Sequence, residues 1–293
     1  MAVATELDAF EDHRPLLTGV AYRMLGRFAD AEDVVQDVWL KWSSLDREQV
    51  REPKAYLVRM TTHLAIDRLR QAQSRRESYV GPWLPEPIAT DFGETAPDAE
   101  QHAVLADTVS LAVLVVLESL SPLERAVFVL REAFGYPFAE IAEMLDRSEP
   151  AVRQLAGRAR RHVDERKPRY TVDPAERKDL TERFLEAAAG GDLEQLMRLL
   201  APDVSLVSDS GGKSRAPRRI IESADKVGRF VAGVSHKAPP QAEYVLREVN
   251  GALSLVVLSE GKPDTVITVE TVNGRIQSIY LIRNPEKMQG VAD

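Results

Sequence analysis

The chain has 293 residues, a formal net charge of −8 and no cysteine. This length suits two or three domains with cores of their own. The negative charge excludes a general nucleic-acid coat protein, which would be basic overall, and the lack of cysteine excludes disulfides, thiol redox sensing and cysteine-ligated zinc. The five histidines have no paired spacing, so we expect no metal site and no cofactor.

The sequence shows no membrane or secretion segment. Its start lacks a basic region followed by an apolar run, and the most apolar stretch, residues 111–117, is far too short to cross a bilayer. We therefore expect a cytoplasmic protein that does not bind membranes. The charge is uneven, because residues 59–76 and 147–169 are basic while residues 30–37 are acidic. Such confined basic patches are typical of a protein that needs help to hold DNA.

The first block, from about residue 7 to residue 76, has an all-helical pattern. A helix is expected over residues 30–42, with Asp30 as its cap. Its apolar residues form one buried stripe: Val34, Val35, Val38, Trp39 and Trp42. The other side is polar and mostly acidic: Asp33, Gln36, Asp37 and Lys41. This face could dock on a basic partner, although the pattern alone favours ordinary solvation.

A second helix is predicted from residue 53 to residue 70. Its expected core stripe is Tyr56, Leu57, Met60, Leu64 and Ala65. Basic and short polar side chains lie on its other faces or follow it: Arg59, Thr62, His63, Arg68, Arg70, Arg75 and Arg76. A basic helix with short polar groups can hold a single DNA strand and read its exposed bases.

Residues 78–97 are rich in proline and glycine and are predicted to form a linker, after which helices resume from about residue 99. Residues 121–163 then predict a helix-turn-helix. Ser121 and Glu124 form a capping box that starts a helix over residues 123–134. Gly135 and Pro137 end this helix, and a short helix over residues 138–145 follows. Asp146 and Arg147 then turn the chain, and Ser148 caps the last helix.

The apolar offsets of the two short helices are those of a helix-turn-helix core: Ile141, Ala142, Leu145, Val152 and Leu155. The opposite side of the last helix carries Arg153, Gln154, Arg158 and Arg161. This face can lie in a major groove, with arginines bonded to guanine edges or phosphates. The alternative is a solvated charged face, but spacing, capping and charge together favour DNA.

A second boundary, near residues 167–174, separates these helices from an α+β region. Helices are expected near residues 175–189, 193–200 and 224–233, and strands at 204–208, 242–249, 253–259, 265–272 and 276–283. Asn250-Gly251 and Asn273-Gly274 are hairpin signals. This order resembles the curved sheet, wrapped round a helix, of SnoaL-like and ketosteroid-isomerase-like cones. Acid–base chemistry in such a cone is one alternative, with candidate groups Asp203, Asp209, His236, Tyr244, Glu270 and Tyr280. A binding or regulatory cone is favoured, because a fold does not confer a function.

The two helical modules resemble those of bacterial extracytoplasmic-function (ECF) sigma factors of the sigma-70 family. The run DAEDVVQDVWLKW, residues 30–42, resembles the helix that grips the clamp of the largest subunit of core RNA polymerase. This implies polymerase contacts by Asp30, Asp33, Gln36, Asp37, Trp39 and Lys41. The run KAYLVRMTTHLAIDRLR, residues 54–70, resembles the helix that recognises and melts the minus-ten promoter element, and His63 stands where many members carry asparagine. Residues 123–163 resemble the module that reads the minus-thirty-five element, which implies DNA contacts by Arg147, Ser148, Glu149, Arg153, Gln154, Arg158 and Arg161.

Three short motifs resemble a sigma-factor subgroup with a fused C-terminal SnoaL-like (NTF2-like) domain. The linker contains its W-L-P-E-P signature as Trp83, Leu84, Pro85, Glu86 and Pro87. A D-G-G-G-K turn appears as Asp209, Ser210, Gly211, Gly212 and Lys213, and an N-P-D/E-K-L tail as Asn284, Pro285, Glu286, Lys287 and Met288. The resemblance implies regulation by the attached domain in place of a separate anti-sigma protein. We expect Trp83 to anchor the linker on the cone near these motifs; the alternative is packing of Trp83 on its own helical neighbour.

The expected organisation is therefore two all-α sigma domains and an α+β cone. We place sigma domain two at residues 1–77, the linker at 78–105, sigma domain four at 106–167 and the cone at 173–293. The expected function is promoter recognition for core RNA polymerase, with promoter DNA as the second partner and no catalysis by the chain itself. The resemblance also allows a small-molecule ligand in the cone. The rivals are a ligand-sensing helix-turn-helix regulator that acts without polymerase, and an enzyme in the cone.

Overall fold

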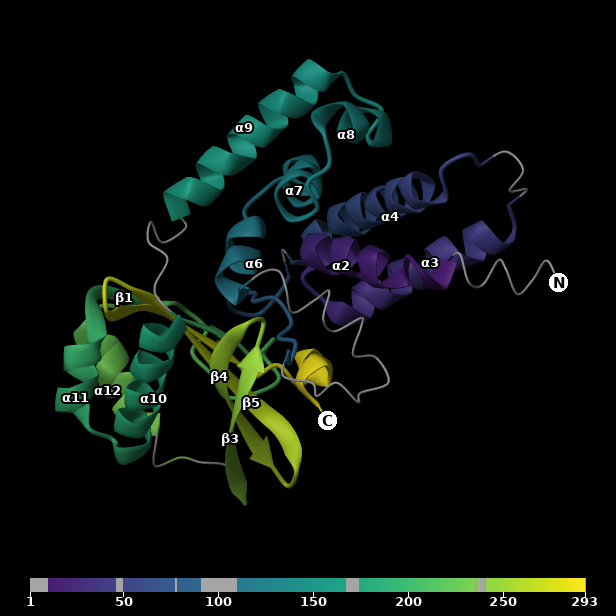
Figure 1. Cartoon of the computed structure of the whole chain (residues 1–293). Coiled ribbons are helices and arrows are strands. Elements are labelled where there is room, and N and C mark those ends of the chain that lie inside the picture. The colour runs from purple at the N-terminus through teal and green to yellow at the C-terminus, as the bar shows by residue number, and fades with distance from the viewer. Residues whose placement is uncertain are drawn as a thin grey trace. The chain divides into compact units, whose positions relative to one another are not determined.

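The computed structural model describes residues 10–45, 50–76, 78–90, 110–166, 174–234, 237 and 241–292. The chain forms two compact units (Figure 1). The first comprises Met1–Glu77 and Phe92–Lys167, and the second comprises Ser78–Asp91 and Pro168–Asp293. The beginning of the predicted linker therefore belongs to the same unit as the C-terminal region. Among the described residues, no helix is both long and apolar enough to cross a membrane.

The first module of unit one consists of α2 (Arg14–Leu25), α3 (Phe28–Ser43) and α4 (Pro53–Arg76). Gly26 ends α2 in a left-handed conformation, with φ of 69°, and its N–H donates to the carbonyl of Tyr22. Helix α3 buries its apolar stripe against α2 and α4 as predicted, except for Trp39, which is only half-buried. The expectation that Asp30 caps α3 is wrong, because the helix begins at Phe28 after Arg27. Asp30 instead lies in the first turn, where a carboxylate is favoured by the helix dipole.

The second module contains α6 (Leu111–Leu117), α7 (Pro122–Phe128), α8 (Phe138–Met144) and α9 (Glu149–Arg166). The capping box is confirmed: the Ser121 hydroxyl accepts from the N–H of Glu124, and the Glu124 carboxylate accepts from the N–H of Ser121. Helix α7 continues as a π-helical turn, η2 (Val129–Ala133), so the predicted helix over residues 123–134 changes its hydrogen-bond pattern halfway. The helix-turn-helix core is buried as predicted, with Leu155 half-buried.

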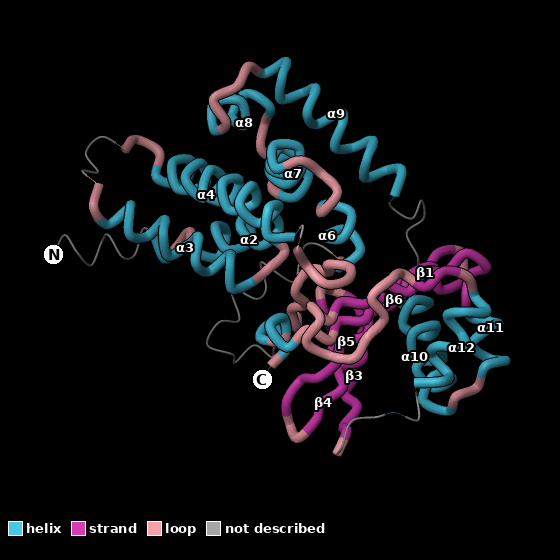
Figure 2. Tube along the Cα trace, turned by 180° about the vertical axis from the view of Figure 1, so that it is seen from behind, coloured by secondary structure: helices cyan, strands magenta, loops and turns pink. Residues whose placement is uncertain are grey.

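Unit two contains a six-stranded sheet. Three helices lie against it (Figure 2): α10 (Pro174–Gly190), α11 (Leu193–Leu199) and α12 (Ala224–Val234). The strand order is β2-β1-β6-β5-β4-β3, and only the β1–β6 pair is parallel. The strands are β1 (Leu200–Asp209), β2 (Ile221–Glu222), β3 (Ala242–Val249), β4 (Ala252–Ser259), β5 (Lys262–Val272) and β6 (Arg275–Ile282). The core between helices and sheet includes Phe184, Leu196, Leu206, Val227 and Ile279.

Both predicted hairpins are confirmed. Asn250 and Gly251 have φ of 50° and 68°, and Asn273 and Gly274 have φ of 50° and 70°. Positive φ at both central residues is the mark of type I′ turns, which match the twist of the flanking strands. A third turn of this kind, at residues 260–261, was not predicted because it carries no Asn-Gly pair. Strand β2 was not predicted because it has only two residues and therefore no apolar run.

Candidate polymerase, promoter and linker sites

The face of α3 that resembles a polymerase-binding surface is exposed and partly paired within its own module. Arg68 of α4 contacts both Asp33, at 3.3 Å, and Asp37, at 3.6 Å. Gln36 and Lys41 are exposed, and Asp30 is half-buried 3.8 Å from Arg27. Trp39 is half-buried, with its ring 5.0 Å from that of Phe10.

Sequence reasoning missed Leu40, whose side chain is 58% exposed on the same face of α3. It lies four residues after Gln36 and three residues after Asp37, so the three side chains are neighbours on the helix surface. An exposed leucine beside acidic side chains gives this face an apolar contact as well as charge. The sequence could have indicated this exposure, because Leu40 lies outside the apolar stripe predicted for α3.

The minus-ten candidates on α4 are not all free to reach DNA. Arg70 is exposed and pairs with Asp67 at 3.0 Å, and Arg68 is held by the acidic residues of α3. Arg75 and Arg76 end the helix, and their side chains lie outside the described set.

The prediction that Thr62 lies outside the core is wrong. Thr62 is fully buried, and its hydroxyl donates to the carbonyl of Val58 at 2.8 Å. The buried stripe of α4 is rotated from the expected one and consists of Leu57, Val58, Thr61, Thr62, Ala65, Ile66 and Leu69. Two threonines can join such a stripe because each hydroxyl is satisfied by the helix backbone. Tyr56, Met60 and Leu64, which were expected in the core, are half-buried.

The predicted DNA-reading face of α9 is exposed. Arg153, Gln154, Arg158 and Arg161 all point to solvent, as do Arg147 and Ser148 in the preceding turn, whereas Glu149 is half-buried. Arg153 pairs with Glu149 and lies 4.7 Å from the centre of the Phe138 ring. Arg158 donates to Glu124 at 2.9 Å. Burial raises the pKa of Glu124, but hydrogen bonds from Ser121 and Arg158 outweigh it, so the pKa is lowered overall.

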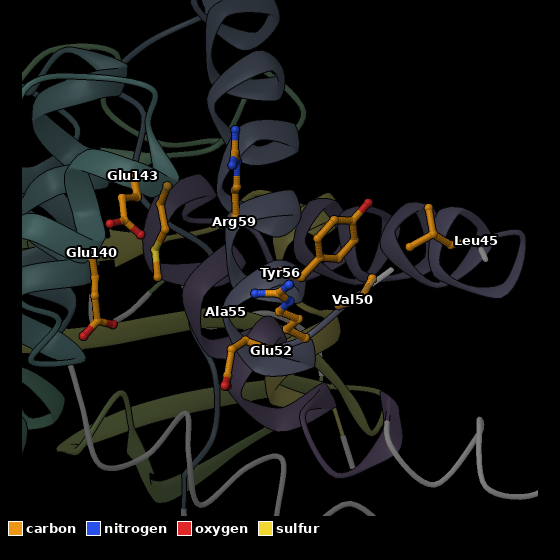
Figure 3. Close-up of a pocket in the computed structure, with 10 residues that line it drawn as sticks. Leu45, Val50, Glu52, Ala55, Tyr56, Arg59, Glu140 and Glu143 are labelled. Carbon is orange, nitrogen blue, oxygen red and sulfur yellow. The ribbon is translucent and has the colours of Figure 1, made fainter. Parts of the chain in front are cut away.

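The two modules of unit one are bonded to each other at the helix-turn-helix. The Arg59 guanidinium contacts both carboxylate oxygens of Asp146 at 2.9 Å, and Nε2 of His63 donates to the carbonyl of Met144 at 2.7 Å. A cleft of about 450 Å³ lies beside these bonds. Figure 3 shows Tyr56 and Arg59 of α4 lining it together with Glu140 and Glu143 of α8.

In unit two, the three short motifs meet at Asp209, the last residue of β1. One carboxylate oxygen accepts from the Tyr79 hydroxyl at 2.5 Å and from the N–H of Gly211 at 3.1 Å. The other accepts from the N–H of Leu84 at 2.8 Å and from the Lys287 ammonium at 2.6 Å. Both charged side chains are at most 1% exposed. A buried ion pair of this kind is stable only with full hydrogen bonding, which the linker supplies.

Lys287 ties the tail to the linker. Its ammonium also donates to the carbonyl of Leu84 and lies 3.1 Å from the centre of the Trp83 ring, a close cation–π contact. Trp83 is half-buried and meets the Tyr79 ring edge-on, at 4.9 Å between centroids. Asn284 donates to the Tyr79 hydroxyl at 2.8 Å. Tyr79 was not among the predicted residues. Its aromatic ring, four positions before Trp83, could have indicated that it belongs to the same anchor.

The glycines of the turn after β1 permit the close approach of Asn284 to the backbone of that turn. Gly211 and Gly212 have φ of 57° and 74°, and a Cβ on Gly211 would lie 2.7 Å from Nδ2 of Asn284. Ser210, which replaces the first glycine of the motif, is not at positive φ and is therefore tolerated. Lys213 closes the turn by an ion pair with Glu286.

The rest of the anchored segment continues along the sheet. Leu84, Pro85, Glu86 and Pro87 are all buried. Ile88 and Asn250 exchange two hydrogen bonds, of 3.1 Å and 2.9 Å. Ala89 then forms a β-bridge with Val249 and donates to the carbonyl of Gly290 at 2.8 Å. Contacts therefore run from Tyr79 to Thr90, whose N–H donates to Glu248.

The candidate groups for an enzyme in the cone are dispersed. Asp203 and Tyr244 are exposed, Asp209 is committed to the linker, and His236 lies outside the described residues. Among the candidates that the structure describes, only Glu270 and Tyr280 are close, because their pairing with Ser278 and Thr268 places them on one face of the sheet. Burial raises the pKa of Glu270, and burial together with the Glu270 charge raises the pKa of Tyr280 to about 12. In the described parts of the chain, no group of ligands suits a metal ion.

Comparison with known proteins agrees with these arrangements. Residues 9–75 match the model of sigma-70 region 2, and residues 110–163 match that of sigma-70 region 4. The ECF RNA polymerase sigma factor SigJ of Mycobacterium tuberculosis (strain ATCC 25618 / H37Rv) is 39% identical over 297 residues, covering 97% of this chain and 94% of that protein. The probable ECF RNA polymerase sigma factor SigI of the same strain is 30% identical over 284 residues, covering 96% and 93%. The crystal structure of the M. tuberculosis SigJ has a TM-score of 0.78 at 37% identity, covering 97% of this chain and 99% of that chain.

Two sigma-70 regions in this order, followed by an α+β cone, define a transcription initiation factor. The chain belongs to the family of ECF RNA polymerase sigma factors. The predicted fold class is confirmed for two all-α sigma domains followed by an α+β domain. The relatives are named as sigma factors and not as enzymes.

Proposed function

We propose that α3 docks on the clamp of core RNA polymerase while α4 and α9 contact the minus-ten and minus-thirty-five elements. The face formed by exposed Asp33, Gln36 and Leu40 and half-buried Asp37 supports the first contact, because it combines charge with an apolar side chain. The exposed row of Arg153, Gln154, Arg158 and Arg161 supports the last. In this proposal the chain catalyses no reaction, and the polymerase supplies the chemistry.

We further propose that the anchored linker regulates how far the two DNA-reading modules can separate. The observation that carries this is the buried contact of Asp209 with Leu84, Tyr79 and Lys287. Helix α4 ends at Arg76, and the anchored segment begins almost at once, at Ser78. Only residues 91–109 then connect the anchor to the second module, which at about 3.5 Å per residue reach roughly 65 Å.

This reach matters because the two promoter elements are about 25 base pairs apart, or about 85 Å along B-DNA. A linker released from the cone would instead offer residues 77–109, which reach roughly 115 Å. The C-terminal unit therefore controls the usable length of the connection. Any ligand that binds the cone and alters the anchor would alter promoter use.

The test replaces Trp83, which lies over Lys287 without carrying charge itself. Trp83→Ala should change run-off transcription with core polymerase at promoters of different spacer length, while the melting of the full chain shows both units folded. Trp83→Phe keeps an aromatic ring over Lys287 and should behave more like the unchanged protein. Equal transcription by all three proteins at every spacer length would refute the regulatory proposal.

A second comparison separates this proposal from its rivals. A chain that ends before Asp173 lacks the cone and should direct transcription with altered spacer preference. A gel shift with and without core polymerase tests a regulator that acts alone, since strong sequence-specific binding by the lone chain would favour that rival. Turnover of an enolisable ketone or an epoxide by residues 173–293 would favour the enzyme.

A further inference from the structure

One edge of the sheet in unit two is largely open. Strand β3 is the last strand in the order, and in the described part of the chain β4 is the only strand that pairs along its length. Two residues of the linker reach the other edge where β3 ends. Ala89 forms its bridge with Val249 there, and the N–H of Thr90 donates to the carbonyl of the residue before Val249. The rest of such an edge offers N–H and C=O groups to another strand.

The turn after β3 fixes which residues face the open edge. In a two-residue hairpin the residues that flank the turn, here Val249 and Ala252, bond to each other. Every second residue of β3 therefore bonds inward to β4, and the residues between them direct their backbone groups outward. Glu248 shows this, because its carbonyl accepts from the linker. The next outward groups along the edge belong to Leu246 and Tyr244.

The same two residues place large apolar side chains in solvent. Tyr244 is 58% exposed and Leu246 is 47% exposed. They share one face of the sheet and lie beside the half-buried Leu255 of β4, which pairs with Leu246. Native edge strands that remain unpaired are usually protected by charged side chains, a proline or a bulge. Outward backbone groups together with exposed apolar side chains make this edge suited to pairing with another strand.

The segment around Val245 is complementary to its own reverse. It reads Glu-Tyr-Val-Leu-Arg, so an antiparallel copy centred on Val245 brings Tyr244 opposite Leu246. The same alignment brings Glu243 opposite Arg247 at both ends of the segment. Aromatic–aliphatic pairs and pairs of opposite charge across two strands both stabilise a sheet. A centre on Tyr244 or Leu246 would instead place a charged side chain opposite Val245.

Arg247 can serve its own unit and a copy at once. Its Nη1 donates to the carbonyl of Val291 at 3.4 Å, which is a long hydrogen bond. A guanidinium has five N–H donors, so it can bind a carboxylate as well as a carbonyl. Glu243 is exposed and lies on the same face of β3 as Arg247. Both charged side chains are therefore on the face where the copy would present its own pair.

We infer that the open edge of β3 is the interface of a homodimer, in which two C-terminal units join their sheets across a two-fold axis at Val245. A two-fold interface uses the same surface on both copies, which a self-complementary strand allows. The pairing covers residues 243–247, because the linker already takes the Glu248 carbonyl. An interface this short gives an association that depends on protein concentration. The inference does not rest on the proposed function, since it needs neither polymerase nor DNA.

The first measurement is the mass of the full chain by sedimentation velocity over a range of concentrations. The mass should rise from the 32.6 kDa of one chain toward twice that value as the concentration increases. A mass of one chain at every concentration up to the solubility limit would overturn the inference.

Two charge reversals test the register of the pairing. Glu243→Arg places arginine opposite arginine at both ends of the segment, and Arg247→Glu places glutamate opposite glutamate. Each variant alone should self-associate about tenfold more weakly, or less than that, than the unchanged protein. An equal mixture of the two variants places arginine opposite glutamate again and should restore the dimer. Glu222→Arg is the matched control, since it makes the same reversal on β2, the edge strand at the other end of the sheet.

Three results of the charge reversals would overturn the inference. These are association of the single variants that equals that of the unchanged protein, a mixture that does not restore the dimer, and equal weakening by the control. Melting at low concentration, where the chains are monomers, shows whether each variant is folded.

Leu246→Pro tests the edge itself. The N–H of Leu246 points away from β4, so proline removes no bond of the sheet within the chain but removes one to the copy. This variant should melt like the unchanged protein at low concentration and keep the mass of one chain at high concentration. Leu246→Thr keeps the N–H and should retain more of the association. Dimerisation of Leu246→Pro equal to that of the unchanged protein would place the contact elsewhere and overturn the inference.

Discussion

Two ion pairs that join distant parts of the sequence differ in their surroundings. Asp209 and Lys287 are at most 1% exposed, whereas Arg59 and Asp146 are 46% and 68% exposed. Removing one partner of a buried pair leaves an uncompensated charge and costs about 3–5 kcal/mol, whereas an exposed pair contributes about 0–1 kcal/mol. The chain therefore holds its linker by a strong, buried ion pair, whereas the ion pair between the two modules of unit one is exposed and weak.

This difference bears on the role proposed for the buried pair. An anchor that sets the length of a connection must survive changes of salt and partner. Burial lets Asp209 and Lys287 meet this requirement, because water and salt reach only the exposed pair.

The largest expected effect is at the anchor. Asp209→Asn should lower the free energy of unfolding of the C-terminal unit by about 3–5 kcal/mol, because Lys287 stays buried without its counter-charge. Urea unfolding of the full chain, followed by hydrogen exchange of the amides in the C-terminal unit, measures the loss. Lys213→Gln is the control, since it breaks a nearby but exposed pair with Glu286 and should cost at most about 1 kcal/mol. Similar losses in the two variants would contradict the distinction between the pairs.

The pieces of the anchor could be predicted from the sequence, but not the way they join. The three motifs predicted which segments meet, and Asp209 and Lys287 were among their residues. Pairing them requires knowing that β1 and β6 are parallel neighbours, so that their ends bring residues 209 and 283 together. A long-range register of this kind leaves no local trace, and the same holds for the bridge between Ala89 and Val249.

Local signals predicted the rest of the fold well. Capping residues marked α7, and Asn-Gly pairs marked two hairpins. One error concerned a helix start, since α3 begins two residues before Asp30, and another arose where tertiary packing chose between two helix faces, as it did for Thr62 on α4. Periodicity shows that a helix has an apolar stripe, but threonines that bond to their own backbone can widen it.

An ion pair on α9 lies between the buried pair and the exposed pair in its exposure to solvent. Arg158 is 52% exposed, but its partner Glu124 is only 12% exposed. Arg158→Ala and Arg153→Ala should each weaken promoter binding by the holoenzyme by about 1–3 kcal/mol if the arginine reads a base, or lower the salt slope by about one if it contacts phosphate. Only Arg158→Ala should also destabilise the second module, by about 1 kcal/mol, because it strips a partner from Glu124.

Arg160→Ala is the matched control for this pair of variants. Arg160 lies on the same helix, outside the predicted DNA-reading face, and contacts Glu132. Binding measured at several salt concentrations, together with thermal melting, separates the effects on DNA from those on stability. Promoter binding that is equally insensitive to all three substitutions would remove α9 from the promoter contact.

The smallest effect concerns a buried carboxylate that has no lysine beside it. Glu270 is 7% exposed, and in the described residues no hydrogen-bond partner reaches its Oε1. Burial raises its pKa, and Arg177 only partly opposes this. The favourable contribution of such a group to folding is complete below the ordinary glutamate pKa and is lost as the pH rises through the higher pKa of the folded protein.

Glu270→Gln should therefore stabilise the C-terminal unit at neutral pH and lose this advantage in acid. The check is the difference in urea midpoint from the unchanged protein at pH 4 and pH 7.5, with Glu243→Gln, at an exposed position on β3, as the control. A difference that does not vary with pH would show that the cone tolerates this buried charge as readily as the anchor tolerates Asp209.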